Sequence, residues 1–205
     1  MITTNPLFSV ISVTLNYKGG LKRTHESLKN QDYDNYEWIV IDGGSNDGTA
    51  EYLKSVQASH ISEKDSGIYD AMNKGIERSN GHYLIFMNAG DCFTDTNILS
   101  ALKEIIEQEN SDFIYGDALE NTDGKIVTKK ARHHSKITQG MFTHHQAMVY
   151  SRALIGDARY SLSYKIAADY DLTLRLLKKV KKISYLPQAI CLFESGGVSQ
   201  RQVLK

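Results

Sequence analysis

The chain lacks most of the features that assign a protein to a class at first sight. Two cysteines, Cys92 and Cys191, are too few for a disulfide framework and fit a reducing cytoplasm. No stretch approaches the roughly 18 apolar residues of a membrane-spanning helix. The first residues lack the basic start and apolar core of a secretion signal. We therefore expect a cytoplasmic protein, in which any membrane association is peripheral or lies in sequence outside this chain.

An excess of charge of one sign is missing too. The 24 Lys and Arg residues balance the 24 Asp and Glu residues, so no nucleic-acid partner is expected. Positive charge is concentrated locally, at residues 125–136 and 178–182. These segments are either solvated faces or surfaces that attract an anionic membrane or a phosphorylated acceptor.

Length and a hydrophobic content of 41% suit one domain with a substantial core. In the first half, predicted strands alternate with predicted helices, which favours a parallel sheet with helices on both faces. The strands are expected at 8–15, 37–41, 60–63 and 83–87, and the helices at 21–31, 48–56, 68–79 and 97–108. The second half is less regular, with strands expected at 113–115, 147–150, 183–186 and 190–193, a hairpin at 117–130 and a helix at 169–180. The tail from Gly196 shows no packing pattern.

Two apolar runs end abruptly at a carboxylate in a turn of small residues. The first is EWIVIDGGSNDGT at 37–49, which contains Asp42, and the second is YLIFMNAGD at 83–91, which ends at Asp91. An α/β sheet binds its ligands at the carboxyl ends of its strands. The two endings therefore predict a nucleotide site and a metal site.

In the first turn, glycines let the backbone approach a ligand closely. We expect Asp42 to accept hydrogen bonds from a base or ribose, and Asp47 to cap the next helix. In the second turn, Asp91 is expected to bind a divalent cation directly and Asn88 through water, because such cations keep several waters beside substrate phosphates. The alternative for the second turn is a polar loop without a ligand. The dinucleotide fingerprint G-x-G-x-x-G is absent.

Two further segments place acids at predicted helix starts. Asp65 opens DSGIYDAMNKG and either caps a helix or extends the nucleotide site. Asp169 and Asp171 lie in AADYDLTLRL, where acids are favourable at a helix N-terminus and where Asp169 could also act as a general base. His145, beside Gln146, either contacts an acceptor or leaving phosphate or is a structural histidine.

The histidines occur as the pairs 133–134 and 144–145. Adjacent histidines on a strand point in different directions, so a two-histidine zinc site is not predicted.

Taken in order, these motifs resemble the family 2 glycosyltransferases with the GT-A fold. Residues 8–16 resemble the opening strand and nucleotide loop, and residues 31–49 resemble the block Q-x-Y…E-x-I-V-x-D-x-G-S-x-D-G-T. Residues 65–75 are similar to a segment of the bacterial polysaccharide branch, which includes colanic-acid-type transferases. Residues 88–91 stand at the position of the D-x-D metal motif, and residues 168–171 with Arg175 at the position of the E-D catalytic base.

The resemblance implies an α/β fold: a Rossmann-like, mostly parallel sheet flanked by helices, with a smaller mixed-strand region on the acceptor side. It implies one domain over residues 1–205, with a nucleotide-binding half to about 115 and an acceptor-side half from about 116. The implied activity is inverting, metal-dependent transfer of a sugar from a nucleotide sugar, with UDP-sugars expected, to a hydroxyl of a glycan in bacterial surface polysaccharide synthesis. The polysaccharide branch implies a lipid-linked acceptor at the inner face of the plasma membrane.

The resemblance also implies functional roles for individual residues of this chain. The resemblance implies that Asp42 contacts the nucleotide base, expected to be uracil, that Asp91 binds Mn²⁺ or Mg²⁺, and that Asp169 is the catalytic base. The other residues that it places in the site are Thr14, Asn16, Asp65 and Lys74 for the nucleotide, Asn88 for the metal or diphosphate, and His145 and Asp171 for the acceptor or diphosphate.

The chain departs from the family pattern at two positions. Asn88 replaces the first Asp of D-x-D, which predicts weak metal binding, and Ala168 replaces the Glu before Asp169. Two other classes of protein compete with this interpretation. A nucleotidyltransferase would need an early Gly-rich loop with Arg and Lys, for which residues 15–20 are a poor substitute. A catalytically weak module that only binds sugar nucleotides or glycans is compatible with Asn88. The sugar, the acceptor and the oligomeric state are not predicted.

Overall fold

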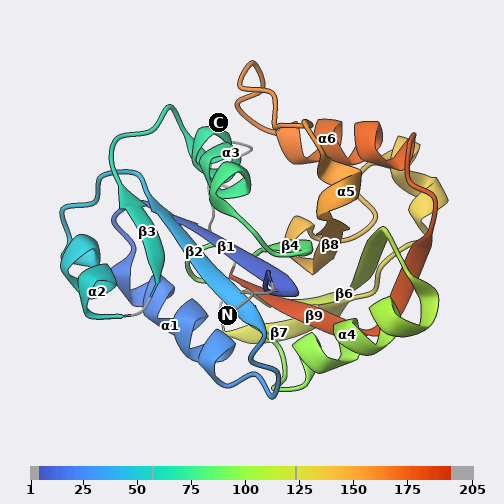
Figure 1. Ribbon diagram of the computed structural model, residues 1–205, viewed down its shortest axis with the longest axis horizontal. Coiled ribbons are helices and arrows are strands. Elements are labelled where there is room, and N and C mark those ends of the chain that lie inside the picture. Colours follow the sequence, from blue (N-terminus) through green and yellow to red (C-terminus); the bar gives the residue numbers. More distant parts are fainter. Residues whose placement is uncertain (1–4, 57, 123, 195–205) are drawn as a thin grey trace.

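The computed structural model describes residues 5–56, 58–122 and 124–194. Within these residues, nine strands form one continuous sheet in the order β3-β2-β1-β4-β8-β6-β9-β5, with β7 paired to β6 (Figure 1). The sheet runs without interruption from the first half of the chain into the second.

The first half has the parallel arrangement that its alternating pattern predicts. β1 (Phe8–Thr14) lies between β2 (Tyr36–Asp42) and β4 (Tyr83–Phe86), and β3 (Ser59–Ser62) extends the edge beside β2. All three pairings are parallel. The carboxyl ends of these strands therefore meet at one edge of the sheet, as a ligand site of this fold class requires.

The second half is mixed. β8 (Met148–Ser151) is antiparallel to both β4 and β6 (Phe113–Thr122), whereas β6 is parallel to β9 (Ile183–Glu194). β7 (Lys125–Lys129) is antiparallel to β6, and β5 (Cys92–Phe93) is antiparallel to β9.

The structure corrects several expected elements of this half. The predicted strands at 183–186 and 190–193 are one strand, β9, whose pairing with β6 is irregular between Gly116 and Ala118. Pro187, which interrupts the sequence pattern, lies inside this strand. The predicted hairpin is confirmed, but its first strand merges with the strand expected at 113–115. The sequence did not predict β5 or the short helix α5 (Arg152–Ile155), because each has too few residues for a periodic hydrophobic pattern. The tail from Gly196 lies outside the described residues.

Helices cover both faces of the sheet (Figure 1). One face carries α1 (Lys18–Lys29), α2 (Thr49–Ser55) and α4 (Ile98–Glu109), and the other carries α3 (Ile68–Arg78), α5 and α6 (Ala168–Leu177). Successive strand residues alternate between the two hydrophobic clusters. In β2, for example, Trp38 and Val40 pack on the first face, and Ile39 and Ile41 pack on the second.

Helix α1 begins three residues earlier than its hydrophobic pattern predicts. The Asp47 carboxylate accepts a hydrogen bond from the Lys18 backbone N–H at 2.8 Å, and its other oxygen accepts from the Thr49 N–H at 3.1 Å. Asp47 therefore accepts from the first backbone donor of both helices, but the residue at the N-cap position of α2 is Gly48, so the prediction of Asp47 as the helix cap is wrong. Gly20 allows the early start because a Cβ there would collide with the Tyr17 ring.

No helix in the described part of the chain is long and apolar enough to cross a membrane.

Candidate active site

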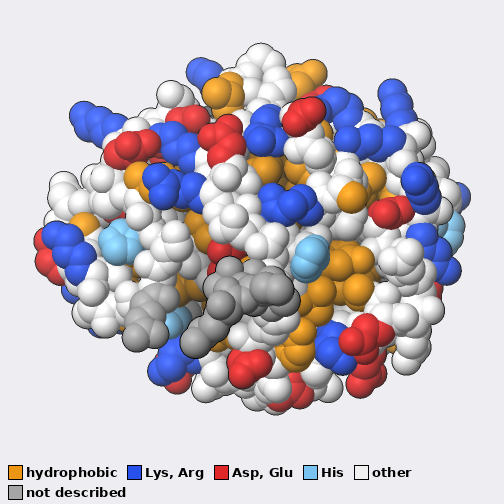
Figure 2. Space-filling model, viewed as in Figure 1, with side chains coloured by type: hydrophobic (Ala, Val, Ile, Leu, Met, Phe, Trp, Pro, Cys, Tyr) orange, Lys and Arg blue, Asp and Glu red, His pale blue; other side chains and the backbone are white. Residues whose placement is uncertain are grey.

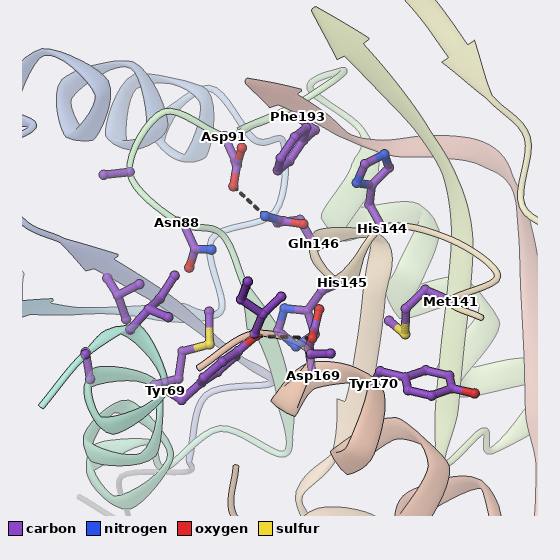
Figure 3. Close-up of a pocket in the computed structure, with 18 of the residues that line it drawn as sticks. Tyr69, Asn88, Asp91, Met141, His144, His145, Gln146, Asp169, Tyr170 and Phe193 are labelled. Carbon is purple, nitrogen blue, oxygen red and sulfur yellow. Dashed lines mark hydrogen bonds between the residues drawn. The ribbon is translucent and has the colours of Figure 1, made fainter. Parts of the chain in front are cut away.

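A cleft of about 1320 Å³ opens at the carboxyl ends of β1 and β4 (Figure 3). Its lining combines the loop after β1, the start of α3, the turn after β4, the segment 141–146 and the start of α6. Both halves of the chain therefore contribute to one cavity. Seven of the sequence-predicted site residues line it: Thr14, Asn16, Asp65, Asn88, Asp91, His145 and Asp169.

Asp91 is the buried acid of this cleft, with 4% of its surface exposed. Its Oδ2 accepts a hydrogen bond from Gln146 Nε2 at 2.7 Å, and its Oδ1 accepts one from the Glu194 backbone N–H at 3.1 Å (Figure 3). The turn that carries it needs glycine, because Gly90 has a φ of 105° and a Cβ there would collide with the Glu194 carboxylate.

Burial raises the pKa of Asp91 to about 7. The hydrogen bonds from the Glu194 N–H and from Gln146 oppose this shift, and the negative charge of Glu194 adds to it. A carboxylate with a raised pKa has its charge only partly compensated by its neighbours.

Two polar oxygens of the cleft lining are buried without a hydrogen-bond partner in the part of the chain that the structure describes: Thr14 Oγ1 and Asn88 Oδ1. A buried polar atom without a partner is costly in a folded protein. Asn88 is in the same turn as Asp91, so its free oxygen is available to a ligand beside that carboxylate. Among the described residues, no group of three or more His, Cys, Asp or Glu side chains could hold a metal ion alone.

Asp169 is the second residue of α6 and is half-buried at the opposite side of the cleft. The helix N-terminus stabilises its negative charge. Tyr69 in α3 donates a hydrogen bond to Asp169 Oδ1 at 3.3 Å. Burial, with a further contribution from Asp169, raises the pKa of Tyr69 to about 12, so this phenol keeps its proton. Ala167 has a φ of 69°, a left-handed conformation that non-glycine residues adopt rarely and that is common at functional sites.

His145 lines the cleft, but it is buried, with 6% of its surface exposed. Its Nε2 is 2.7 Å from the Tyr160 hydroxyl, and its ring packs on Phe86 at 5.0 Å between ring centres. Burial lowers the pKa of His145, and the nearby Asp169 opposes that shift. The structure therefore gives His145 a neutral imidazole with a structural partner; its contact with an acceptor or phosphate stays a prediction.

The structure bears on the expected divergence of the histidine pairs. Neither pair lies on a strand, since His134 and His145 begin short 3-10 helices. The rings of His133 and His134 do not point apart, because their centres are 4.1 Å from each other. His144 and His145 do diverge: His144 stacks on Phe193 and hydrogen-bonds Glu120 at 2.8 Å.

On the nucleotide side, Asn16 and Asp65 border the cleft from neighbouring loops. Asn16 Oδ1 accepts from the Asn46 N–H at 2.8 Å, which ties the loop after β1 to the loop after β2. Asp65 Oδ1 accepts from the Gly67 N–H at 2.9 Å. The residue that caps α3 is Gly67, so the alternative of Asp65 as the helix cap is wrong.

The remaining three predicted residues are not part of the cleft lining. Asp42 is fully buried and accepts hydrogen bonds from the Ser62 hydroxyl at 2.5 Å and from Ser45. Lys74 pairs with Glu63 at 2.7 Å, and Asp171 pairs with Arg175 at 2.9 Å. Their expected roles in binding stay predictions, and the structure shows that each already has partners within the chain.

Sequence reasoning did not assign a role to Gln146 toward Asp91, to Tyr69 or to Glu194. The partners of these residues are 55, 100 and 103 positions away in the chain, so no local pattern could reveal the contacts. Glu194 also accepts from the Tyr17 hydroxyl at 2.5 Å and from Arg23 at 2.6 Å, which joins the loop after β1 to the end of β9.

The sheet topology and the cleft define a GT-A domain, an α/β sheet with an acidic site at its carboxyl edge. Residues 9–168 match the family model described as glycosyl transferase family 2. The chain therefore belongs to glycosyl transferase family 2, as the ordered motifs predicted.

Proteins similar to this chain carry names of the same class. The PGL/p-HBAD biosynthesis glycosyltransferase of Mycobacterium bovis is 30% identical over 216 residues, which cover 98% of this chain and 82% of the relative. Among solved structures, Staphylococcus aureus TarS 1–349 in complex with UDP has a TM-score of 0.78 at 20% identity, over 96% of this chain. The mannosyltransferase PcManGT from Pyrobaculum calidifontis, in complex with GDP-Man and Mn²⁺, has a TM-score of 0.71 at 15% identity and covers 98% of this chain. The chain spans 63% of the TarS fragment and 60% of PcManGT.

Proposed function

We propose that this domain transfers a sugar from a nucleotide-sugar donor, a UDP-sugar, to a hydroxyl of a glycan acceptor, with inversion at the anomeric carbon. The observation that carries the proposal is the shared cleft. Asp91 and the free Asn88 oxygen come from one half of the chain, and Asp169 comes from the other. A site for a charged leaving group and a site for a base therefore face one cavity.

The donor is proposed to bind along the loops that follow β1 and β3. Thr14, Asn16 and Asp65 supply oxygen atoms there, and the Thr14 hydroxyl, which has no hydrogen-bond partner among the described residues, supports a polar ligand at this position. Asp42 supports this side from outside the lining, because it holds Ser45, whose hydroxyl accepts from the Asn16 N–H at 2.7 Å. The similar TarS fragment is in complex with UDP, which supports a uridine nucleotide.

The residues present fit a divalent cation that takes most of its ligands from the substrate. Asp91 offers a carboxylate, and Asn88 offers an oxygen that has no other partner in residues 5–56, 58–122 and 124–194. Mg²⁺ or Mn²⁺ needs only one or two protein ligands beside phosphates and water. When bound, such a cation stabilises negative charge on the departing diphosphate as a Lewis acid. The similar PcManGT is in complex with Mn²⁺ as well as GDP-Man, which supports this assignment.

Asp169 is proposed to accept the proton of the attacking hydroxyl. Tyr69 occupies Oδ1, so Oδ2 is the oxygen that remains for the acceptor. The Tyr69 hydrogen bond orients the Asp169 side chain, and a general base requires a positioned side chain of this kind. The acceptor oxygen then attacks the anomeric carbon from the face opposite the nucleotide, without a covalent enzyme intermediate.

Release of UDP tests this function directly. Incubation with UDP-glucose, UDP-galactose and UDP-N-acetylglucosamine, each with Mn²⁺, should liberate UDP from at least one donor by hydrolysis or transfer. A module that only binds sugar nucleotides would bind one of these donors and release no UDP, which would contradict the proposal.

Gln146 should matter as the residue that orients Asp91. Replacement by alanine removes the 2.7 Å hydrogen bond to Oδ2, and the loss of an outer partner typically weakens metal affinity by roughly ten- to a hundredfold. We expect Gln146→Ala to weaken Mn²⁺-dependent UDP binding by about that factor in calorimetric titrations. Gln188→Ala is the control, because Gln188 bonds Asn97 outside the cleft lining. Equal affinities for the two variants would remove Gln146 from this role.

A further inference from the structure

The side of α1 that faces the segment after β4 carries a row of polar side chains. Figure 2 shows Lys, Arg, Asp and Glu side chains spread over the surface in view, which is the usual place for polar groups. Thr24 and Ser27, one turn apart on α1, instead bond the backbone of the neighbouring segment, and Gln31 continues the row just beyond the helix. The Phe93 N–H donates to the Ser27 hydroxyl at 3.2 Å, and Gln31 Nε2 donates to the Asp95 carbonyl at 2.7 Å. The row therefore holds the segment after β4 against α1.

Thr24 is the fully buried member of this row, with 0% of its surface exposed. Its hydroxyl donates to the Asp91 carbonyl at 2.8 Å and accepts from the Gly90 N–H at 3.0 Å. A threonine inside a helix commonly bonds the carbonyl four residues earlier, but the Gly20 carbonyl, like that of Asn88, is farther away, at 3.2 Å. Because a hydroxyl has only one proton to donate, the shorter contact indicates that Thr24 serves the turn more than its own helix.

The two bonds to Thr24 fix the backbone of the turn that carries the Asp91 carboxylate. This turn also has a bond of its own, from the Asp91 N–H to the Asn88 carbonyl at 3.0 Å. Gly90 and Asp91 are both buried, so the N–H of the first and the carbonyl of the second need partners within the protein. If the Thr24 hydroxyl is removed, the turn loses both bonds, and the backbone from which the carboxylate extends is free to shift.

We propose that Thr24 is a positioning residue for the cation: its hydroxyl fixes the turn from Asn88 to Asp91 and thereby the place from which the Asp91 carboxylate meets the metal. Thr24 lies outside the cleft lining, so it acts through Asp91, and its role rests on the proposed function. Gln146 and the Glu194 N–H bond the carboxylate itself, so they hold the side chain while Thr24 holds the backbone. Outer partners of this kind set the affinity of a metal site, because they orient its ligands.

Exchange of the Gly90 amide hydrogen tests the contact without donor or metal. Thr24→Val removes the hydroxyl and keeps the shape of the side chain, whereas Thr24→Ser keeps the hydroxyl. By NMR on the intact chain, we expect the Gly90 amide to exchange at least about tenfold faster in Thr24→Val than in wild type, relative to the amides of β1, which report global unfolding. In Thr24→Ser the rate should stay within about threefold of wild type. Unchanged exchange in Thr24→Val would overturn the proposal.

The Mn²⁺ requirement of UDP binding tests the role in the site. UDP would be titrated calorimetrically into each variant at a series of Mn²⁺ concentrations. Thr24→Val should need roughly tenfold more Mn²⁺ than wild type for half-maximal UDP binding, and saturating Mn²⁺ should restore the affinity for UDP. Thr24→Ser should stay within about twofold of wild type, because it retains the hydroxyl.

Thr173→Val is the matched control for loss of a buried hydroxyl. Thr173 is also a fully buried threonine on a helix, and its hydroxyl lies 3.5 Å from that of Tyr150, outside the cleft lining. This variant should keep the Mn²⁺ requirement of wild type. Equal Mn²⁺ requirements in Thr24→Val and Thr173→Val would leave Thr24 a packing role alone and overturn the proposal. UDP binding by wild type that does not depend on Mn²⁺ would instead overturn the proposed function and, with it, this role, so the two failures are distinguishable.

Discussion

Asp169→Asn should abolish turnover while donor binding is unchanged. Asparagine keeps the size of the side chain and its Oδ1 can still accept the Tyr69 hydrogen bond, but it cannot take a proton from the acceptor. General-base catalysis contributes about 10²- to 10⁴-fold, so we expect kcat to fall by roughly a thousandfold. The measurement is steady-state UDP release, with the affinity for UDP and Mn²⁺ determined by calorimetry on the same variant.

The control for this variant is Asp157→Asn, which changes an exposed carboxylate outside the cleft lining. It should leave both kcat and UDP affinity within about twofold of wild type, because isolated surface substitutions have small effects. Turnover by Asp169→Asn at the wild-type rate would remove Asp169 from the role of base. A parallel loss of UDP affinity would indicate that Asp169 organises the donor site.

Asp91→Asn should have opposite effects on stability and on metal-dependent binding. The pKa of Asp91 is raised to about 7 from an ordinary value of 3.8, so the folded chain holds this proton more tightly than the unfolded chain. Between the pH values that equal these two pKa values, the free energy of unfolding falls as the pH rises, by at most on the order of 4 kcal/mol in total. Asparagine does not ionise, and rotation of the Gln146 amide lets its oxygen accept from the new NH2 group, so the variant should unfold several degrees above wild type at pH 8 in the absence of ligand.

The pH dependence distinguishes this explanation from a simple packing change. The difference in unfolding temperature between Asp91→Asn and wild type should be large at pH 8 and should shrink as the pH falls toward 3.8, where wild-type Asp91 is protonated in the folded state and about half protonated in the unfolded state. In the presence of Mn²⁺ and UDP the order should reverse, because only the wild type has the carboxylate. A difference that is constant with pH would show that ionisation of Asp91 is not its cause.

The first half of the fold was predictable because its signals are local. The apolar runs that end at Asp42 and Asp91 are strands in one parallel sheet, as predicted, and the period-2 alternation of β2 places its side chains on two faces. The second half was harder because its order depends on distant pairing. β9 is held along β6 through a register irregularity beside Pro187, and this pairing carries the strand past a proline that local rules interpret as a break.

The same distinction applies to the cleft. Asp91 and Asp169 could be named from sequence because each follows a local motif at an element boundary. The partners that set their chemistry, Gln146 and Tyr69, could not, because each contact joins segments far apart in the chain. Asp42 shows the converse case: its motif is strong, but its carboxylate is occupied by Ser45 and Ser62 within the fold.

Thermal unfolding with a panel of nucleotides tests the central claim most directly. Wild type and Asp91→Ala would each be measured with UDP, GDP, CMP and TMP, with and without Mn²⁺. A ligand at a hundredfold excess over its Kd stabilises the native state by about 2.7 kcal/mol. We predict that UDP stabilises the wild type, that this effect requires Mn²⁺, and that it is lost in Asp91→Ala. Stabilisation by no nucleotide, or an identical UDP effect in Asp91→Ala, would contradict a metal-dependent nucleotide-sugar site at Asp91.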